Sequence, residues 1–351
     1  GAGVMACKNA LVETDGNFES AIELLRKKGE ATAVKKAGRI AAEGAVLAIV
    51  EEDKNAAIVE VNSETDFVAK NDKFKTFVAN VADQVLATSA SDVEGLLAEK
   101  FIKDESKTVK EELVSQIAVI GENLTIRRFA KINSDGIVVP YIHAGGRIGV
   151  LVEASTSVVN DEVKEALKNI AMQIAAMSPQ YISREDISDD ELAKMREITI
   201  DSALNDVASL PKPIQKDIFA EALSTDALSA EDKAILEEKQ NDKYLFNFLS
   251  KEAIASLAAI SMSKKEEICA NKIFNGLVEG RISKQLKEVC LLDQTYVMAA
   301  DGKQTVKAYL AEVSKEVGAT VALKSFVRFE TGEGIEKKEE DFAAEVAKQM
   351  Q

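Results

Sequence analysis

The chain has 351 residues, which is enough for two or three domains with a sizeable hydrophobic core. Its 44 basic and 59 acidic residues give a net charge of −15, so repulsion by phosphate backbones argues against direct binding to nucleic acid. The single histidine, His143, excludes a two-histidine metal site and a histidine relay, and no glycine-rich phosphate-binding loop is present, so we expect no enzyme, no cofactor and no bound metal.

Two short helices are predicted at the start of the chain, over residues 4–14 and 17–28. Asp15-Gly16-Asn17 would form the turn between them, with Asn17 capping the second helix and Gly29 ending it. Two helices of this length bury too little apolar area to be stable alone, so a third helix is needed. The lysine-rich residues 30–39 are predicted to be a linker or a final helix that leads to the next domain.

A polar segment containing Thr65-Asp66-Phe67-Val68 follows a predicted apolar strand over residues 56–61. This position places Phe67 in the connection after the strand, where chains are exposed and functional side chains concentrate. Two interpretations are open from the local sequence. Phe67 either folds back as a hydrophobic lid or protrudes toward a partner, with the Asp66 carboxylate beside it.

Residues 40–179 mix strand and helix signals and contain a faint internal repeat. Residues 77–87 align without gaps with residues 166–176, and each copy follows a predicted strand. The identical pairs are Asn80/Asn169, Ala82/Ala171, Gln84/Gln173 and Ala87/Ala176. We therefore predict two related α+β half-domains with antiparallel sheets. The second copy has Ala154–Ser157 after its strand and no counterpart of Asp66-Phe67, so this pair is not needed to build the repeated unit.

Continuous helices are predicted from Ser183 to Leu291. Two apolar stripes at three- and four-residue spacing flank a break at Pro211, and they predict an antiparallel helical hairpin. The stripes are Leu192, Met195, Thr199, Ala203 and Val207, then Phe274, Val278, Ile282, Leu286 and Val289. We expect these stripes to pair without help from residues 211–264. The aromatic cluster at residues 244–249 is either core of the hairpin tip or a contact surface.

Strands are predicted again at residues 295–298 and 325–329, where they would complete the sheet of the second half-domain. An acidic amphipathic helix is predicted from Glu339 to the end of the chain, with Phe342 and Val346 on one face. A helix with so narrow an apolar stripe either docks weakly on the core or binds a partner.

Several motifs occur along the chain in the order in which the elongation factor Ts family has them. They are Gly1–Leu11, Lys35–Arg39, Ala41–Gly44, the segment TDFVAKND at residues 65–72, Gly121-Glu122-Asn123 with Arg127-Arg128, Tyr141-Ile142-His143 before Arg147–Leu151, Val278–Arg281, Arg328-Phe329-Glu330, Gly332–Lys337 and Asp341–Ala347. The chain thus resembles the nucleotide-exchange factors that act on the GTPase elongation factor Tu. Compared with that family it lacks the first N-terminal helix and has an enlarged hairpin between Pro211 and Lys264.

The resemblance implies an α+β fold with a particular domain order. It predicts a ubiquitin-associated-like (UBA-like) helical module without its first helix at 1–39, half-domains at 40–135 and at 136–182 plus 292–329, a helical hairpin or coiled coil at 183–291, and a C-terminal helical module at 330–351. It also implies that Thr65, Asp66, Phe67 and Val68 enter the GTPase near its Mg²⁺ and promote GDP release.

Further partner contacts implied by the resemblance are His143, Val4, Met5, Lys8, Phe342 and Val346. The alternative for His143 is a loop histidine that caps the following strand, and the alternative for Val4 and Met5 is the core of the small N-terminal module. The alternative function is a helical scaffold or UBA-type adaptor without exchange activity. The presence of TDFV in only one repeat and the ordered motifs argue against it.

Cys7, Cys269 and Cys290 are odd in number and far apart, so they indicate no disulfide framework and favour a reducing compartment. No apolar run is long enough to span a membrane. We expect a bacterial cytoplasmic protein. An organelle is also compatible, because the first residue is Gly rather than Met, so we expect the true N-terminus, with any signal or transit peptide, to be absent from this sequence. A homodimer through the hairpin is a further possibility.

Overall fold

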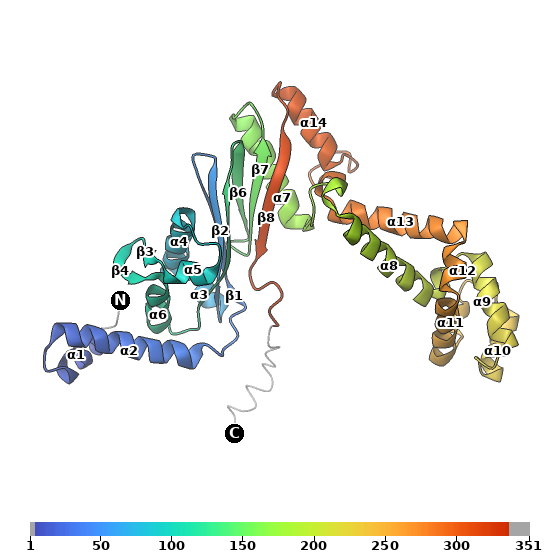
Figure 1. The fold of residues 1–351 in the computed structure, drawn as a ribbon, viewed down its shortest axis with the longest axis horizontal. Coiled ribbons are helices and arrows are strands. Elements are labelled where there is room, and N and C mark those ends of the chain that lie inside the picture. Colours follow the sequence, from blue (N-terminus) through green and yellow to red (C-terminus); the bar gives the residue numbers. More distant parts are fainter. Residues whose placement is uncertain (1–3, 337–351) are drawn as a thin grey trace. The chain divides into compact units, whose positions relative to one another are not determined.

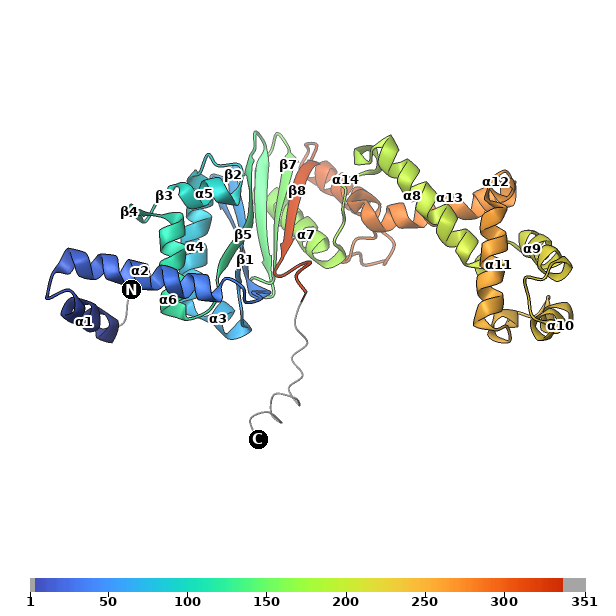
Figure 2. The ribbon, with the colours of Figure 1, turned by 60° about the horizontal axis from the view of Figure 1, so that its bottom comes forward.

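The computed structural model describes residues 4–336, which belong to two compact units. Of the described residues, 4–178 and 295–336 form the first unit and 179–294 form the second. Helices and small antiparallel sheets make up both the ribbon of Figure 1 and the rotated view of Figure 2, which confirms the predicted α+β class. The predicted C-terminal helix with Phe342 and Val346 lies outside the described residues. No helix within residues 4–336 is both long and apolar enough to cross a membrane.

Two three-stranded antiparallel sheets form the centre of the first unit, with the orders β1-β2-β5 and β6-β7-β8. Their strands are β1 (Glu43–Glu51), β2 (Asn55–Ser63), β5 (Thr125–Asn133), β6 (Ile137–His143), β7 (Ile148–Ser155) and β8 (Ala322–Glu330). The sheets lie face to face, and Val46 and Ile58 of one pack with Leu151 of the other in a shared core. A Cβ added at Gly149 would lie 2.4 Å from Val46 Cγ1, so this close approach requires glycine in β7.

Helices cover the outer faces of both sheets, which gives four layers in Figure 2. The helices on the sheets are α4 (Asp72–Ala87) and α7 (Asp161–Met177), with α6 (Val109–Ile120) beside α4 and α14 (Val306–Glu316) beside α7. Helix α4 packs on β1 and β2 and is amphipathic, with Phe74, Phe77 and Val81 fully buried. Helix α7 packs on β6 and β7 in the same way. Between α4 and α6 the chain forms α5 (Val93–Ala98), β3 (Lys100–Phe101) and β4 (Asp104–Thr108).

Matching hydrogen bonds relate the two sheet-and-helix halves. Gln84 of α4 donates to Lys100 O at 3.2 Å and accepts from Ile102 N at 2.7 Å. Gln173 of α7 donates to Thr295 O at 3.1 Å and accepts from Val297 N at 2.8 Å. Each buried glutamine therefore holds two backbone groups of the segment that leads to the next helix. This shared pattern supports the repeat that the sequence alignment predicts.

The prediction of a strand at residues 295–298 is wrong. Thr295 forms only an isolated bridge with Thr305, and residues 297 and 298 form a turn. The physical reason is that Gln173 supplies the two hydrogen bonds that a neighbouring strand would otherwise make. The strand predicted at residues 325–329 is confirmed as part of β8, which pairs with β7.

The N-terminal helices are α1 (Val4–Glu13) and α2 (Phe18–Lys36). Asn17 caps α2 as predicted, because its Oδ1 accepts from Ser20 N at 2.9 Å. Gly29 does not end this helix, and that expectation is wrong. Gly29 is buried in the middle of α2, where a Cβ would lie 3.6 Å from Val114 Cγ1 of α6. Packing of α2 on α6 outweighs the low helix propensity of glycine.

The second unit is helical and has one continuous core. Its elements are η1 (Arg184–Asp186), α8 (Asp189–Asn205), η2 (Val207–Ser209), α9 (Lys212–Ser224), α10 (Ala230–Lys239), η3 (Leu245–Asn247), α11 (Lys251–Ser263), α12 (Lys265–Cys269), α13 (Lys272–Val289) and η4 (Leu291–Asp293). The two predicted stripes meet where α8 packs on α13, but α11 also packs on α8 and buries Leu257 in the same core. The hairpin therefore shares its core with residues 211–264, contrary to our expectation of independent pairing.

The aromatic segment at residues 244–249 fits each of its two interpretations, core of the hairpin tip and contact surface, in part. Leu245 is buried, and the Phe246 ring packs against Phe219 with 6.2 Å between centroids. Tyr244 and Phe248 are exposed. The segment is therefore partly core of the second unit and partly surface.

Candidate functional site

One end of the first unit brings together motifs that are far apart in the sequence. Residue Glu43 at the start of β1 pairs with Ser63 at the end of β2. The β6–β7 turn lies beside them, because Val46 N donates to Gly146 O at 2.7 Å. In Figure 1 the short helix after β2 and the chain leaving β8 lie at this same end. We call this region the site end; it contains residues 64–72, 121–123, 143–147 and 330–336.

The TDFV motif divides into two anchoring residues and two presented residues. Thr65 is the N-cap of α3 (Asp66–Lys70), and Val68 packs against the core between the first sheet and its helices. Phe67 is 81% exposed, which rules out the interpretation as a hydrophobic lid. Asp66 and Phe67 therefore occupy the exposed first turn of a helix whose neighbouring residues are fixed.

The Asp66 carboxylate is paired with Lys70 of the same helix, with Oδ2 2.6 Å from Nζ. The hydrogen bond from Lys70 holds the pKa of this carboxyl below its ordinary value, so Asp66 is ionised at neutral pH. Both side chains are largely exposed, and water and salt screen such a pair. A partner that supplied its own cation would compete with Lys70 for this carboxylate.

Glu122 binds the segment that precedes α3. Its Oε2 accepts from the backbone N–H groups of Glu64 and Thr65, each at 3.0 Å, and its Oε1 accepts from the Thr65 hydroxyl at 2.6 Å. The sequence motif Gly121-Glu122-Asn123 marked this position, but nothing in it indicated that the carboxylate holds a turn 57 residues away.

His143 ends β6 and is exposed at the site end. Its Nδ1 lies 3.0 Å from the Tyr141 hydroxyl, so the ring contacts a side chain of its own strand. Ala144, Gly145 and Gly146 all have positive φ, at 48°, 67° and 104°. This tight left-handed turn presents His143 next to a bare glycine backbone at Gly145.

The N-terminal residues that the resemblance selected lie on the surface of α1. Val4 is 84% exposed and Met5 is 63% exposed, so neither belongs to the core of the N-terminal helices. Lys8 is also exposed. These three residues are therefore available for a partner, whereas the selected residues Phe342 and Val346 lie beyond the described part of the chain.

A buried carboxylate fixes the chain that leaves β8. Glu60 is fully buried in β2, and its Oε1 accepts from Arg127 Nη1 at 3.0 Å, Asn62 Nδ2 at 3.1 Å and Gly332 N at 2.8 Å. Its Oε2 accepts from Arg128 Nε at 2.6 Å. Burial raises the pKa of this carboxyl, but the hydrogen bonds from these groups outweigh burial and lower the pKa overall.

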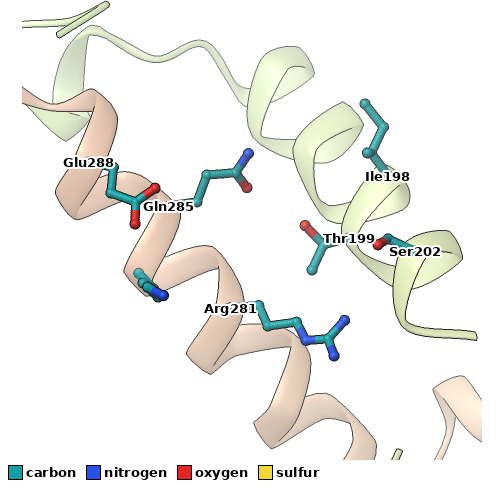
Figure 3. A pocket seen from close by; sticks show the side chains of 7 residues that line it. Ile198, Thr199, Ser202, Arg281, Gln285 and Glu288 are labelled. Carbon is teal, nitrogen blue, oxygen red and sulfur yellow. The ribbon is translucent and has the colours of Figure 1, made fainter. Parts of the chain in front are cut away.

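The second unit has a separate hollow of about 370 Å³ between α8 and α13. It is lined by Ile198, Thr199, Ser202, Arg281, Lys284, Gln285 and Glu288. Figure 3 shows Thr199 and Ser202 on one helix and Arg281 on the other. None of the partner-contact residues expected from the sequence lines this hollow, although Thr199 of the first apolar stripe and Arg281 of the motif Val278–Arg281 do. Among residues 4–336, no group of three or more His, Cys, Asp or Glu side chains could hold a metal ion.

Comparisons with known proteins agree with the order of the sequence motifs. A family model described as Elongation factor TS matches residues 64–333. Elongation factor Ts of Clostridium novyi (strain NT) is 43% identical over 352 residues, covering 100% of this chain and 94% of the relative. Elongation factor Ts of Clostridium tetani (strain Massachusetts / E88) is 42% identical and covers 100% and 95%. The protein of the same name from Clostridioides difficile (strain 630) is 42% identical and covers 100% and 94%.

Proposed function

This chain belongs to the elongation factor Ts family of translation elongation factors, and we propose that it is a guanine nucleotide exchange factor for elongation factor Tu. It acts on a GTPase partner and has no catalytic residues of its own. The observation that carries the proposal is Phe67, a large aromatic that is 81% exposed on a turn fixed by its neighbours. An exposed phenylalanine in a fixed position is suited to insertion into a partner.

Exchange follows from differential binding. A protein that binds the nucleotide-free GTPase more tightly than the GDP-bound form weakens nucleotide binding by the same factor. In the proposed mechanism the TDFV segment enters the GTPase near the Mg²⁺ that bridges protein and phosphates. Phe67 separates elements of the GTPase, and the Asp66 carboxylate interacts with the polar groups that are displaced.

The energetics require more contacts than Phe67 alone. Burying one phenylalanine contributes about 1.5–3 kcal/mol, which corresponds to a change of about ten- to a hundredfold in nucleotide affinity. Larger effects need a wider surface. His143 lies at the same end of the sheets as Phe67, and Val4, Met5 and Lys8 are exposed on α1. We propose these residues as further contacts, together with Phe342 and Val346.

The test is the release of a fluorescent GDP analogue from elongation factor Tu, followed with and without this protein. The release rate should rise with the concentration of the protein and then saturate. Light scattering of the mixture should show a complex with GDP-free elongation factor Tu. A stable complex without any acceleration of release would favour the scaffold or adaptor alternative and contradict the proposal.

The named relatives come from clostridial bacteria, which supports the bacterial cytoplasm as the place of action. A homodimer through the second unit stays a proposal. The test is the mass of the protein in solution, measured by light scattering for the full chain and for a variant without the second unit. A monomeric mass for the full chain would contradict it.

A further inference from the structure

We propose that Glu122 is a positioning residue that holds Asp66 and Phe67 in place, an inference that rests on the proposed exchange function. Three of its hydrogen bonds reach the two residues before α3, across 57 to 58 positions of sequence. Glu122 is half-buried beneath the turn and contacts Thr65 rather than the presented side chains.

Helix α3 needs an external anchor because it is too short to be stable alone. It has five residues, none of them buried, and a single helical turn is far below the length at which helices form in water. The N-cap bond from Val68 N to Thr65 Oγ1 is long, at 3.4 Å. Packing of the half-buried Val68 fixes one side of the turn. At its beginning Ser63 Oγ donates to Thr65 O at 3.1 Å, and Glu122 adds three hydrogen bonds to Glu64 and Thr65.

The geometry of Glu122 matches its three donors. A carboxylate offers only acceptors, and here it faces two backbone N–H groups and one hydroxyl. Charge-assisted hydrogen bonds of this kind are stronger than neutral ones. Gly121, with φ of 87°, ends α6 in the left-handed conformation and turns the chain so that Glu122 faces Thr65.

A reciprocal contact strengthens the attachment. Glu64 Oε1 accepts from Asn123 N at 2.6 Å, and Asn123 Nδ2 donates to Arg39 O at 2.8 Å. Lys36, the last residue of α2, donates from Nζ to Gly121 O. The turn at residues 121–123 therefore holds both the TDFV segment and the chain that leaves the N-terminal helices. These contacts preorganise the site end in the free protein.

Loss of the anchor at Glu122 and loss of the inserted Phe67 should change the kinetics of GDP release in different ways. Without Glu122, Phe67 can still reach the GTPase, but ordering the turn then opposes binding. Glu122→Ala should therefore raise the protein concentration that gives half-maximal GDP release and leave the maximal release rate unchanged. Phe67→Ala removes the inserted group itself and should lower the maximal rate.

The experiment compares Glu122→Ala with Glu105→Ala, a control that removes an exposed glutamate of the same unit, in β4 and outside the site end. Amide hydrogen exchange is measured on each free protein, and GDP release is measured against protein concentration. For Glu122→Ala we expect faster exchange at the amides of Glu64, Thr65 and Val68, and a half-saturating concentration about tenfold higher, as expected for the loss of about 1.4 kcal/mol. Glu105→Ala should match the wild type in both measurements.

Each alternative outcome has a definite meaning. Unchanged amide exchange in Glu122→Ala would overturn the proposal, whatever happens to GDP release. A lower maximal rate at an unchanged half-saturating concentration would also overturn it, because Glu122 would then act in the exchange step. Failure of the wild type to accelerate GDP release would refute the exchange function, while the amide measurement would still decide whether Glu122 holds the turn.

A milder variant covers the case in which Glu122→Ala does not fold. Glu122→Gln keeps the shape, and its amide oxygen can accept from the two N–H groups while its NH₂ group faces the Thr65 hydroxyl. It should shift amide exchange and half-saturation in the same direction but by less. Wild-type behaviour of a folded Glu122→Gln in both measurements would contradict the proposal, because charge-assisted bonds would then make no contribution.

Discussion

Replacing the buried carboxylate of Glu60 by an amide tests how the site end is held together. All the groups around this carboxylate are donors: the two guanidiniums of Arg127 and Arg128, the Asn62 amide and the Gly332 N–H. In Glu60→Gln the new NH₂ group faces one of these donors whichever way it is turned. The variant loses at least one hydrogen bond and the buried counter-charge of two arginines.

The expected loss of stability in Glu60→Gln depends on how exposed its two arginine partners are. Removing one member of a buried ion pair typically costs about 3–5 kcal/mol. Arg127 and Arg128 reach solvent, with 26% and 31% of their side chains exposed, so we expect a loss of about 3 kcal/mol, the lower value. For a unit of this size that loss lowers Tm by about 6–12 °C. Differential scanning calorimetry measures it.

Glu333→Gln is the matched control, because Glu333 pairs with Arg128 at 3.0 Å but has 49% of its side chain exposed. Exposed ion pairs contribute about 0–1 kcal/mol, so its Tm should fall by no more than about 4 °C. Equal shifts in Glu60→Gln and Glu333→Gln would refute the argument that the buried carboxylate organises this network.

The difference between wild type and Glu60→Gln should also depend on pH. Burial raises the pKa of the Glu60 carboxyl, but the hydrogen bonds from Gly332, Asn62 and the two arginines hold it below its ordinary value of about 4.5. Since the folded-state pKa lies below the unfolded one, the stabilisation is complete above about pH 4.5 and is lost as the pH falls through the folded pKa. The Tm difference should therefore shrink in acid, and growth in acid would contradict the assignment.

Two further predictions concern the fold. Gln173→Leu should lower the free energy of unfolding of the first unit, measured in urea, by about 2–3 kcal/mol, because Thr295 O and Val297 N lose their buried partner. The control Asn169→Leu, in the same helix, loses one hydrogen bond to the Tyr309 hydroxyl and should lower it by less. Joining α8 to α13 by a short turn in place of residues 211–264 should remove part of the core of the second unit and lower its helix content by circular dichroism, while GDP release persists. Unchanged thermal stability of the shortened second unit would contradict the shared core.

The elements that sequence predicts well depend on neighbours along the chain. Asn17 caps α2, and the helical stripe through Phe274 and Val278 faces the core, because capping and helical periodicity are local properties. The failures have tertiary causes. Gly29 stays helical because α6 packs on it, and residues 295–298 form no strand because Gln173 satisfies their backbone.

The candidate site, too, has a part that the sequence predicts and a part that it does not. The sequence marked TDFV as the functional segment but could not separate the presented Phe67 from the anchoring Val68, since both are apolar residues in one short motif. The contacts that hold the segment were not predictable. Apart from Asn62 beside Glu60, the groups that Glu122 and Glu60 bind lie 57 to 272 positions away, and no periodicity connects such residues.

The most direct test of the proposed function is the effect of Phe67→Ala on GDP release from elongation factor Tu, with thermal melting of the same variant. About a fifth of this side chain is buried, so its removal should change stability by no more than about 1 kcal/mol. Loss of an inserted aromatic typically costs at least about 2 kcal/mol; because Phe67 acts in the exchange step itself, this predicts a maximal release rate about 30-fold lower.

Tyr244→Ala is the control, because it removes an aromatic that is 57% exposed in the second unit. It should match the wild type in both measurements. We predict that Phe67→Ala alone loses exchange activity while its melting curve stays near that of the wild type. Wild-type release rates for Phe67→Ala, or a large fall in its Tm, would contradict the account.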